Sequence, residues 1–186
     1  MADGLFYVDS RSPFISGDVG AVTLAATDKA LIPVANIPVL GSNYFSFVGK
    51  AVRIRLFGRM TTAATPGNGT FSVYYGTGAD ANGVAVCASA ALALSANGTN
   101  LSWMAELIIR CRTMGATGTL FGTGLFCPNV GLIASTLQPV MIPASAPAAS
   151  ASVDLTASLV LSPQFKRSGS TAETMQVHDV SYEALN

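Results

Sequence analysis

Charged side chains are scarce in this sequence. Only 11% of the 186 residues are charged, and 10 basic residues balance 10 acidic ones. A chain with zero formal net charge lacks the basic excess typical of nucleic-acid-binding proteins, so we expect no nucleic-acid partner. Half of the residues are hydrophobic, which argues against a disordered chain. A low charge density fits a protein whose surface is partly covered by a partner, and it fits a compact monomer equally well.

Long apolar runs and a secretory signal are also missing. No stretch approaches the roughly 18 consecutive apolar residues of a membrane helix, so we expect no membrane partner. The N-terminus, MADGLFYVDSRSPF, has neither a basic region nor a continuous apolar region, which predicts synthesis in a cytoplasm without export. The length predicts one domain with a sizeable core.

Residues that carry enzyme chemistry are few. His178 is the single histidine, and the cysteines have neither metal-ligand nor disulfide spacing. Nucleophile-elbow, phosphate-loop, dinucleotide-binding and calcium-loop motifs are absent. The carboxylates are scattered, and the phase of Glu106 with Arg110 and Arg112 predicts a salt-bridged surface strip. We therefore predict a protein that is not an enzyme, with no catalytic residue, no cofactor and no metal site. The three cysteines are Cys87, Cys111 and Cys127.

A run with a two-residue period is the strongest structural signal. From Leu101 to Thr113 apolar residues recur at alternate positions, which predicts a half-buried strand. A glycine-rich break follows, and Thr119–Cys127 is predicted to return as a second strand. Trp103 and Cys111 share the apolar phase of the first run, so both are expected to be buried. This hairpin is predicted to be the centre of an all-β domain.

Further strands are predicted on both sides of this hairpin, separated by Asn-Gly and Pro-Gly turn signals. The Ala-rich run from residue 84 to 94 would be a helix in isolation, but the flanking Asn-Gly pairs favour a strand. Pro163 is expected to end the strand that precedes it. In the last strand, Met175 and Val177 are expected on one face, with His178, Val180 and Tyr182 on the other. The predicted strands are Lys50–Thr62, Thr70–Thr77, Val84–Leu94, Leu137–Ile142, Asp154–Ser162 and Thr171–Leu185.

About eight antiparallel strands predict a β-sandwich, with a jelly roll as the preferred connectivity and an immunoglobulin-like sandwich as the alternative. Residues 1–44 are predicted to be an extended N-terminal arm, and residues 45–186 the sandwich domain. The arm contains apolar side chains that need cover, either from their own domain or from a neighbouring subunit. These are Leu5, Phe6, Tyr7, Phe14 and Ile15.

One row of side chains is a candidate docking strip for a partner. Arg53, Arg55, Phe57 and Arg59 are predicted to share one face of a strand whose other face is apolar. An aromatic side chain flanked by arginines is typical of protein interfaces, and the arginines predict an acidic partner surface. The alternative is an ordinary solvent-exposed sheet face.

Three segments carry a resemblance to a known class of proteins. They are VRIRLFGRMTTAATPGNGTFSVYYGTG (52–78), NLSWMAELIIRCRTMGATGTLFGTGLF (100–126) and SGSTAETMQVHDVSYEALN (168–186). Together they resemble small β-sandwich structural proteins of tailed bacteriophage heads, the capsid decoration or cement proteins. The resemblance implies a non-enzymatic virion protein on the capsid surface. It also implies the major capsid protein as partner, self-association as a homotrimer, and no catalytic residues.

A binding module is the alternative function. A phage tail component or a host-surface or carbohydrate-binding sandwich has the same predicted fold, so fold alone does not separate them. The aromatic residues that would stack on a sugar are Trp103, Tyr74, Tyr75 and Tyr182.

Overall fold

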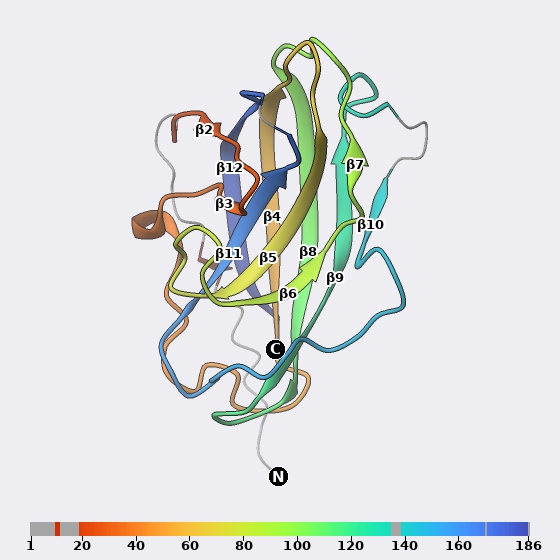
Figure 1. The fold of residues 1–186 in the computed structure, drawn as a ribbon. Coiled ribbons are helices and arrows are strands. Elements are labelled where there is room, and N and C mark those ends of the chain that lie inside the picture. The colour runs from red at the N-terminus through yellow and green to blue at the C-terminus, as the bar shows by residue number, and fades with distance from the viewer. Residues whose placement is uncertain (1–9, 12–18, 135–138, 170, 186) are drawn as a thin grey trace.

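The protein folds into two antiparallel β-sheets packed face to face (Figure 1). The structure is a computed structural model, and it describes residues 10–11, 19–134, 139–169 and 171–185. Sheet A is 7-stranded with the order β1-β12-β4-β8-β9-β10, and its seventh strand, β2, also pairs with β12. Sheet B is 5-stranded with the order β3-β11-β5-β6, and its fifth strand, β7, also pairs with β5. The strands are β1 (Ser10–Arg11), β2 (Val22–Thr23), β3 (Lys29–Ala30), β4 (Ala51–Thr61), β5 (Asn68–Gly76), β6 (Val84–Ala88), β7 (Leu92–Ala93), β8 (Leu101–Thr113), β9 (Thr119–Pro128), β10 (Val140–Ile142), β11 (Val160–Arg167) and β12 (Thr174–Leu185).

This architecture confirms the predicted all-β class and the antiparallel sandwich, whereas the jelly-roll connectivity is not confirmed. Helix is limited, in the described part of the chain, to one short 3₁₀ turn, η1 (Val34–Asn36). The described residues therefore include no helix with the length and apolar character needed to cross a membrane. The predicted hairpin is β8 and β9, which lie side by side within sheet A.

The core lies between the two sheets and is rich in aromatic side chains. Phe71 from sheet B stacks on Phe126 from sheet A, with ring centroids 5.4 Å apart. Trp103 lies 5.8 Å from Phe126 by the same measure and is 3% exposed, as the sequence predicted. Directly opposite Trp103, β4 carries Gly58. An added Cβ at Gly58 would lie 2.6 Å from Trp103 Cζ2, so the indole occupies the space that a side chain would need.

The predicted end of a strand at Pro163 is wrong. β11 begins at Val160 and continues through Pro163, which is paired with Val73. The Pro163 carbonyl accepts a hydrogen bond from Leu31 N at 3.0 Å, so the backbone of Pro163 faces the β3 side. Because the N–H and C=O of a strand residue point to the same neighbour, the missing N–H removes no hydrogen bond to β5.

The predicted faces of the last strand are wrong after Val177. Met175, Val177, Val180 and Tyr182 are all buried, whereas strict alternation would place Val177 and Val180 on opposite faces. The register with β4 shifts between Val177 and Asp179, so His178 is the extra residue of a β-bulge. The bulge resets the alternation, and His178 itself is exposed.

The described part of the N-terminal segment packs on its own domain. β2 pairs with β12 and β3 pairs with β11, which adds strands to both sheets. Leu24, Leu31 and Ile32 are buried in the common core. The boundary at residue 44 stays a prediction. The apolar arm residues Leu5, Phe6, Tyr7, Phe14 and Ile15 lie outside the described residues.

A buried ion pair fixes the turn between β11 and β12. Arg167 Nε lies 2.9 Å from Glu173 Oε2, and Glu173 is fully buried. The same Arg167 Nε donates to Leu24 O at 3.1 Å, and Leu24 N donates to Glu173 O at 2.9 Å. The pair therefore joins the N-terminal segment to the turn before β12.

Candidate docking face

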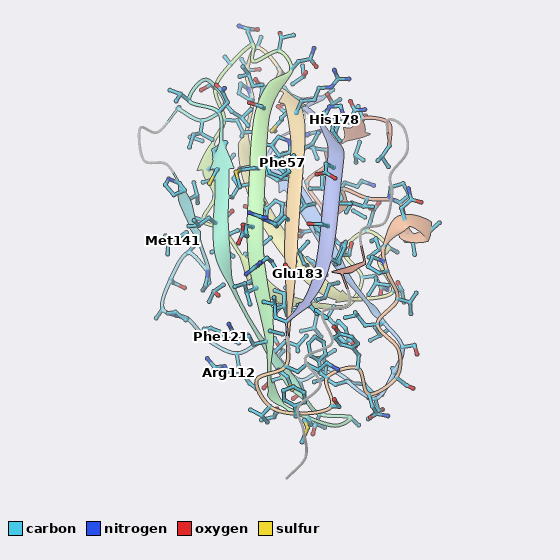
Figure 2. All side chains as sticks on the ribbon, turned by 180° about the vertical axis from the view of Figure 1, so that it is seen from behind. Phe57, Arg112, Phe121, Met141, His178 and Glu183 are labelled. Atoms are coloured by element: carbon cyan, nitrogen blue, oxygen red, sulfur yellow. The ribbon has the colours of Figure 1, made fainter. Side chains whose placement is uncertain are left out.

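The structure places all four predicted docking residues on the outer face of β4. Arg53 and Arg59 are partly exposed, Arg55 is exposed, and Phe57 is 44% exposed. The alternate residues Val52, Ile54 and Leu56 are buried. Figure 2 shows this face of sheet A, with Phe57 on β4 facing the viewer. The alternation predicted from the sequence therefore holds along β4, and the docking role of the row stays a prediction.

The arginines of the row have partners within the sheet. Arg55 Nε lies 2.8 Å from Glu106 Oε2 on β8, and Arg53 Nη1 lies 2.9 Å from Glu183 Oε2 on β12. Arg59 Nε donates to Gln176 Oε1 at 2.9 Å. The face is therefore of mixed charge rather than uniformly positive.

The sequence predicted the salt-bridged strip but assigned Glu106 the wrong partners. Glu106 pairs with Arg55 and Arg53 on the adjacent strand, and not with Arg110 and Arg112 on its own strand. Residues four apart in a strand are separated by about 13 Å, whereas directly opposite side chains on paired strands lie about 5 Å apart. Cross-strand neighbours therefore supply the partners of Glu106.

An apolar patch adjoins the arginine row. Phe57 is paired with Met104 on β8, and Met104 is paired with Cys127 on β9. Beside them, Leu125 on β9 is paired with Met141 on β10, which is 65% exposed. A shallow hollow of about 300 Å³ lies in this patch. Its lining consists of Met104, Glu106, Ile108, Thr123, Gly124, Leu125 and Cys127.

Sequence reasoning missed the part of the patch that comes from β9 and β10. Leu125 and Cys127 share a strand phase, which is a signal that they share a face. That phase does not show which face of β9 is buried. The pairing of Leu125 with Met141 joins residues from two strands whose register the sequence does not reveal.

The outer face of sheet B is partly covered by the chain's own loops. Gln164 points outward from β11, yet it is fully buried, because its Oε1 accepts from Ala81 N at 2.9 Å and its Nε2 donates to Ala79 O at 3.0 Å. Asp28 accepts hydrogen bonds from Ser72 Oγ at 2.6 Å and from Tyr74 Oη at 3.1 Å. Burial, together with the Asp28 carboxylate, raises the pKa of Tyr74. Sheet A has no comparable cover over β4 and β8 in the described structure.

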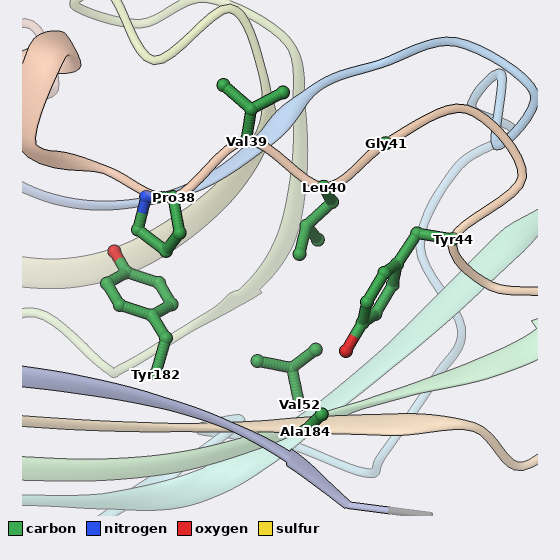
Figure 3. Close-up of a pocket in the computed structure, with 8 residues that line it drawn as sticks. All are labelled: Pro38, Val39, Leu40, Gly41, Tyr44, Val52, Tyr182 and Ala184. Carbon is green, nitrogen blue, oxygen red and sulfur yellow. The ribbon is translucent and has the colours of Figure 1, made fainter. Parts of the chain in front are cut away.

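A second hollow, of about 90 Å³, lies where residues 38–44 cross the ends of β4 and β12 (Figure 3). Val52 and Tyr182 contribute from the strands, and Tyr182 Oη donates to Leu161 O at 2.9 Å. Burial raises the pKa of Tyr182. The volume is below the roughly 300 Å³ at which ligand pockets begin, and none of the lining residues is charged. We assign this hollow no chemistry.

Comparisons of the chain with protein-family models, curated proteins and solved structures gave no match. Within the described ranges, no cluster of three or more His, Cys, Asp or Glu side chains is placed to hold a metal ion. The candidate site is therefore the outer face of sheet A, which consists of the arginine row on β4 and the adjoining apolar patch on β8, β9 and β10. We call this surface the docking face.

The aromatic residues considered for sugar stacking do not form an open platform. Trp103, Tyr75 and Tyr182 are buried in the core. Tyr74 is partly buried beside Asp28. Three of the four rings therefore cannot contact a sugar without unfolding, which removes the basis for a glycan site at these residues.

The three cysteines are free, and their burial predicts an order of reactivity. Burial raises the pKa of each thiol, to about 12 for Cys87, so the reactive thiolate is rare at pH 8. Cys127 is partly exposed on the docking face, whereas Cys87 and Cys111 are buried. We expect a maleimide reagent to label Cys127 alone in the folded protein, and all three after urea is added. Mass spectrometry of labelled peptides checks this, and labelling of Cys87 as fast as Cys127 would contradict the burial.

Proposed function

We propose that this chain is a non-enzymatic structural protein of a virion, a capsid decoration protein that docks on the major capsid protein through the outer face of sheet A. One observation carries the docking: the chain's own segments cover part of the outer face of sheet B, whereas the described residues place no such cover over β4 and β8 of sheet A. The resemblance of three sequence segments to phage head proteins supplies the class of partner.

The composition of the open face supports a protein partner. Methionine, aromatic residues and arginine are enriched at protein–protein interfaces, while lysine and aspartate are depleted. The face combines Phe57, Met104 and Met141 with arginines that already have partners in the sheet. Arginines held by ion pairs lose less conformational freedom on docking than free side chains.

Docking of this kind would stabilise a capsid by linkage. A protein that binds the assembled lattice, and not its separated subunits, shifts the equilibrium toward the lattice in proportion to its affinity and concentration. A rigid sandwich with an open sheet face suits this role, because little order has to be created when it binds.

Phe57→Ala tests the face. The chain is mixed with capsids of the encoding phage that were prepared without it, and binding is measured by co-sedimentation. A hot-spot aromatic contributes about 2 kcal/mol or more, so we expect Phe57→Ala to weaken binding at least about 30-fold. Phe47→Ala is the matched control, because Phe47 is also 44% exposed but lies in the loop before β4.

The outcomes separate the proposal from its alternatives. Weaker binding by Phe57→Ala with unchanged binding by Phe47→Ala supports docking through sheet A. Equal losses in both variants would exclude this face. Wild-type protein that ignores capsids but labels phage tails in immunogold electron microscopy would replace decoration with a tail role.

A further inference from the structure

The charged residues are confined to part of the molecule. The sequence has no charged residue between Asp80 and Glu106, and none between Arg112 and Asp154. In the structure these two stretches supply β6, β7, β9 and β10 with their connections. Figure 1 shows β7, β9 and β10 together on one side of the sandwich, away from β2, β3 and η1. One side of the protein is therefore built from segments without charge.

Backbone hydrogen bonds make this side continuous across the edges of both sheets. Ala134 N donates to Ala93 O at 2.8 Å, and Ala144 N donates to Ala88 O at 3.2 Å. Leu94 also forms a bridge with Ile133. We use the term charge-free flank for residues 84–94, 129–134 and 139–144, which include β6, β7 and β10. Residues 135–138 are outside the described structure and form no part of it.

The charge-free flank exposes apolar side chains to solvent. Val130 is 82% exposed and Met141 is 65% exposed, the two largest values among the large apolar residues described. Met141 lines a hollow of about 540 Å³, and every residue of this lining is apolar. The lining is Ala90, Ala91, Leu92, Ala93, Ile133, Pro139, Val140, Met141 and Ala144.

The described strands of the flank also lack the charged side chains that oppose pairing with another chain. Natural edge strands that face water commonly carry lysine or inward-pointing charges, which oppose contact with another chain. β7 and β10 carry no charged side chain. The edge on the other side differs, because β12 carries Asp179 and Glu183 and is covered at both ends by β1 and β2.

From this segregation of charge we infer that the charge-free flank binds a second copy of this chain. A charged partner surface would lose its hydration there and find no opposite charge, which is unfavourable. Two charge-free flanks bury apolar surface without that cost. The flank also has a protruding Val130 and a hollow, the kind of pair that a self-complementary contact needs. The flank adjoins the docking face and shares Met141 with it. Binding of a second copy is therefore tested without capsids, and also through Ala91, which lines the hollow of the flank and not that of the docking face.

Static light scattering of the purified protein tests the inference without capsids present. The monomer mass is 19.0 kDa, and we expect the wild type to have a multiple of it at micromolar concentration. Met141→Glu places an unpaired carboxylate in the contact, and a buried charge without a partner is strongly unfavourable. We therefore expect the dissociation constant of the self-association to rise at least about 100-fold. Ala91→Glu, at an exposed position of the same flank, is expected to act likewise.

Val39→Glu is the matched control. Val39 is 58% exposed, similar to Met141, but belongs to the N-terminal segment rather than the flank. The Val39→Glu variant is expected to keep the wild-type mass. The fluorescence emission of the buried Trp103 shows whether each variant is folded. A wild type that stays monomeric at 100-fold higher concentration would overturn the inference. The inference would also be overturned if both flank variants kept the wild-type mass, or if the Val39→Glu variant dissociated.

Discussion

Arg167→Ala is expected to lower the free energy of unfolding by about 3–5 kcal/mol, because it leaves a buried carboxylate without its partner. Glu173 is fully buried and Arg167 Nε lies 2.9 Å from its Oε2. The substitution also removes the hydrogen bond from Arg167 Nε to Leu24 O. Urea unfolding followed by Trp103 fluorescence measures the change.

Two controls isolate the buried pair. Lys29→Ala breaks an exposed pair, in which Lys29 Nζ lies 2.7 Å from Asp80 Oδ2, and should cost less than about 1 kcal/mol. The double variant Arg167→Met with Glu173→Gln removes both charges and should recover much of the stability lost by Arg167→Ala. If Arg167→Ala costs no more than Lys29→Ala, the pair does not fix the turn before β12.

Gly58→Ala is expected to destabilise the protein by about 1–3 kcal/mol through overpacking. An added Cβ at Gly58 would lie 2.1 Å from Gln176 O and 2.6 Å from Trp103 Cζ2. Both the backbone of β12 and the indole would have to move. Urea unfolding gives the loss of stability, and near-ultraviolet circular dichroism reports whether the packing of Trp103 changes.

Gly41→Ala is the control for the loss of backbone freedom that any glycine-to-alanine substitution causes. A Cβ added at Gly41 would have no heavy atom within 4 Å beyond its chain neighbours, so an alanine meets open space there. Replacing a glycine by alanine at an unstrained position changes stability by less than about 1 kcal/mol, in the stabilising direction. Equal stability of the Gly58→Ala and Gly41→Ala variants would show that β4 and β12 are not tightly packed around Trp103.

The fold class could be predicted because the strongest signals are local. The alternation in β8 and β4 extends over enough residues to define a buried and an exposed face without knowledge of their neighbours. The same alternation predicts Trp103 and Cys111 in the core, where both lie. The β-bulge at His178 could not be predicted, because an extra residue becomes visible only when its strand is aligned with β4.

The docking face could be predicted only in part, for the same reason. Arg53, Arg55, Phe57 and Arg59 belong to one strand, so the period of that strand placed them together. Glu106 and Met141 join them through strand pairing over long sequence separations. Pro163 could not be placed for the same reason. Whether a proline fits inside β11 depends on which neighbouring strand faces its backbone nitrogen, and the sequence does not show this.

The strand order has a consequence for how the protein is made on the ribosome. β11 and β12 emerge after the strands that they join, because β11 lies between β3 and β5, and β12 lies between β1 and β4. A nascent chain that ends before residue 160 lacks an inner strand of both sheets and exposes the unpaired backbone edges of β4 and β5. Non-local pairing of this kind slows folding and leaves incomplete chains open to aggregation. Productive folding therefore waits until β12 has left the exit tunnel.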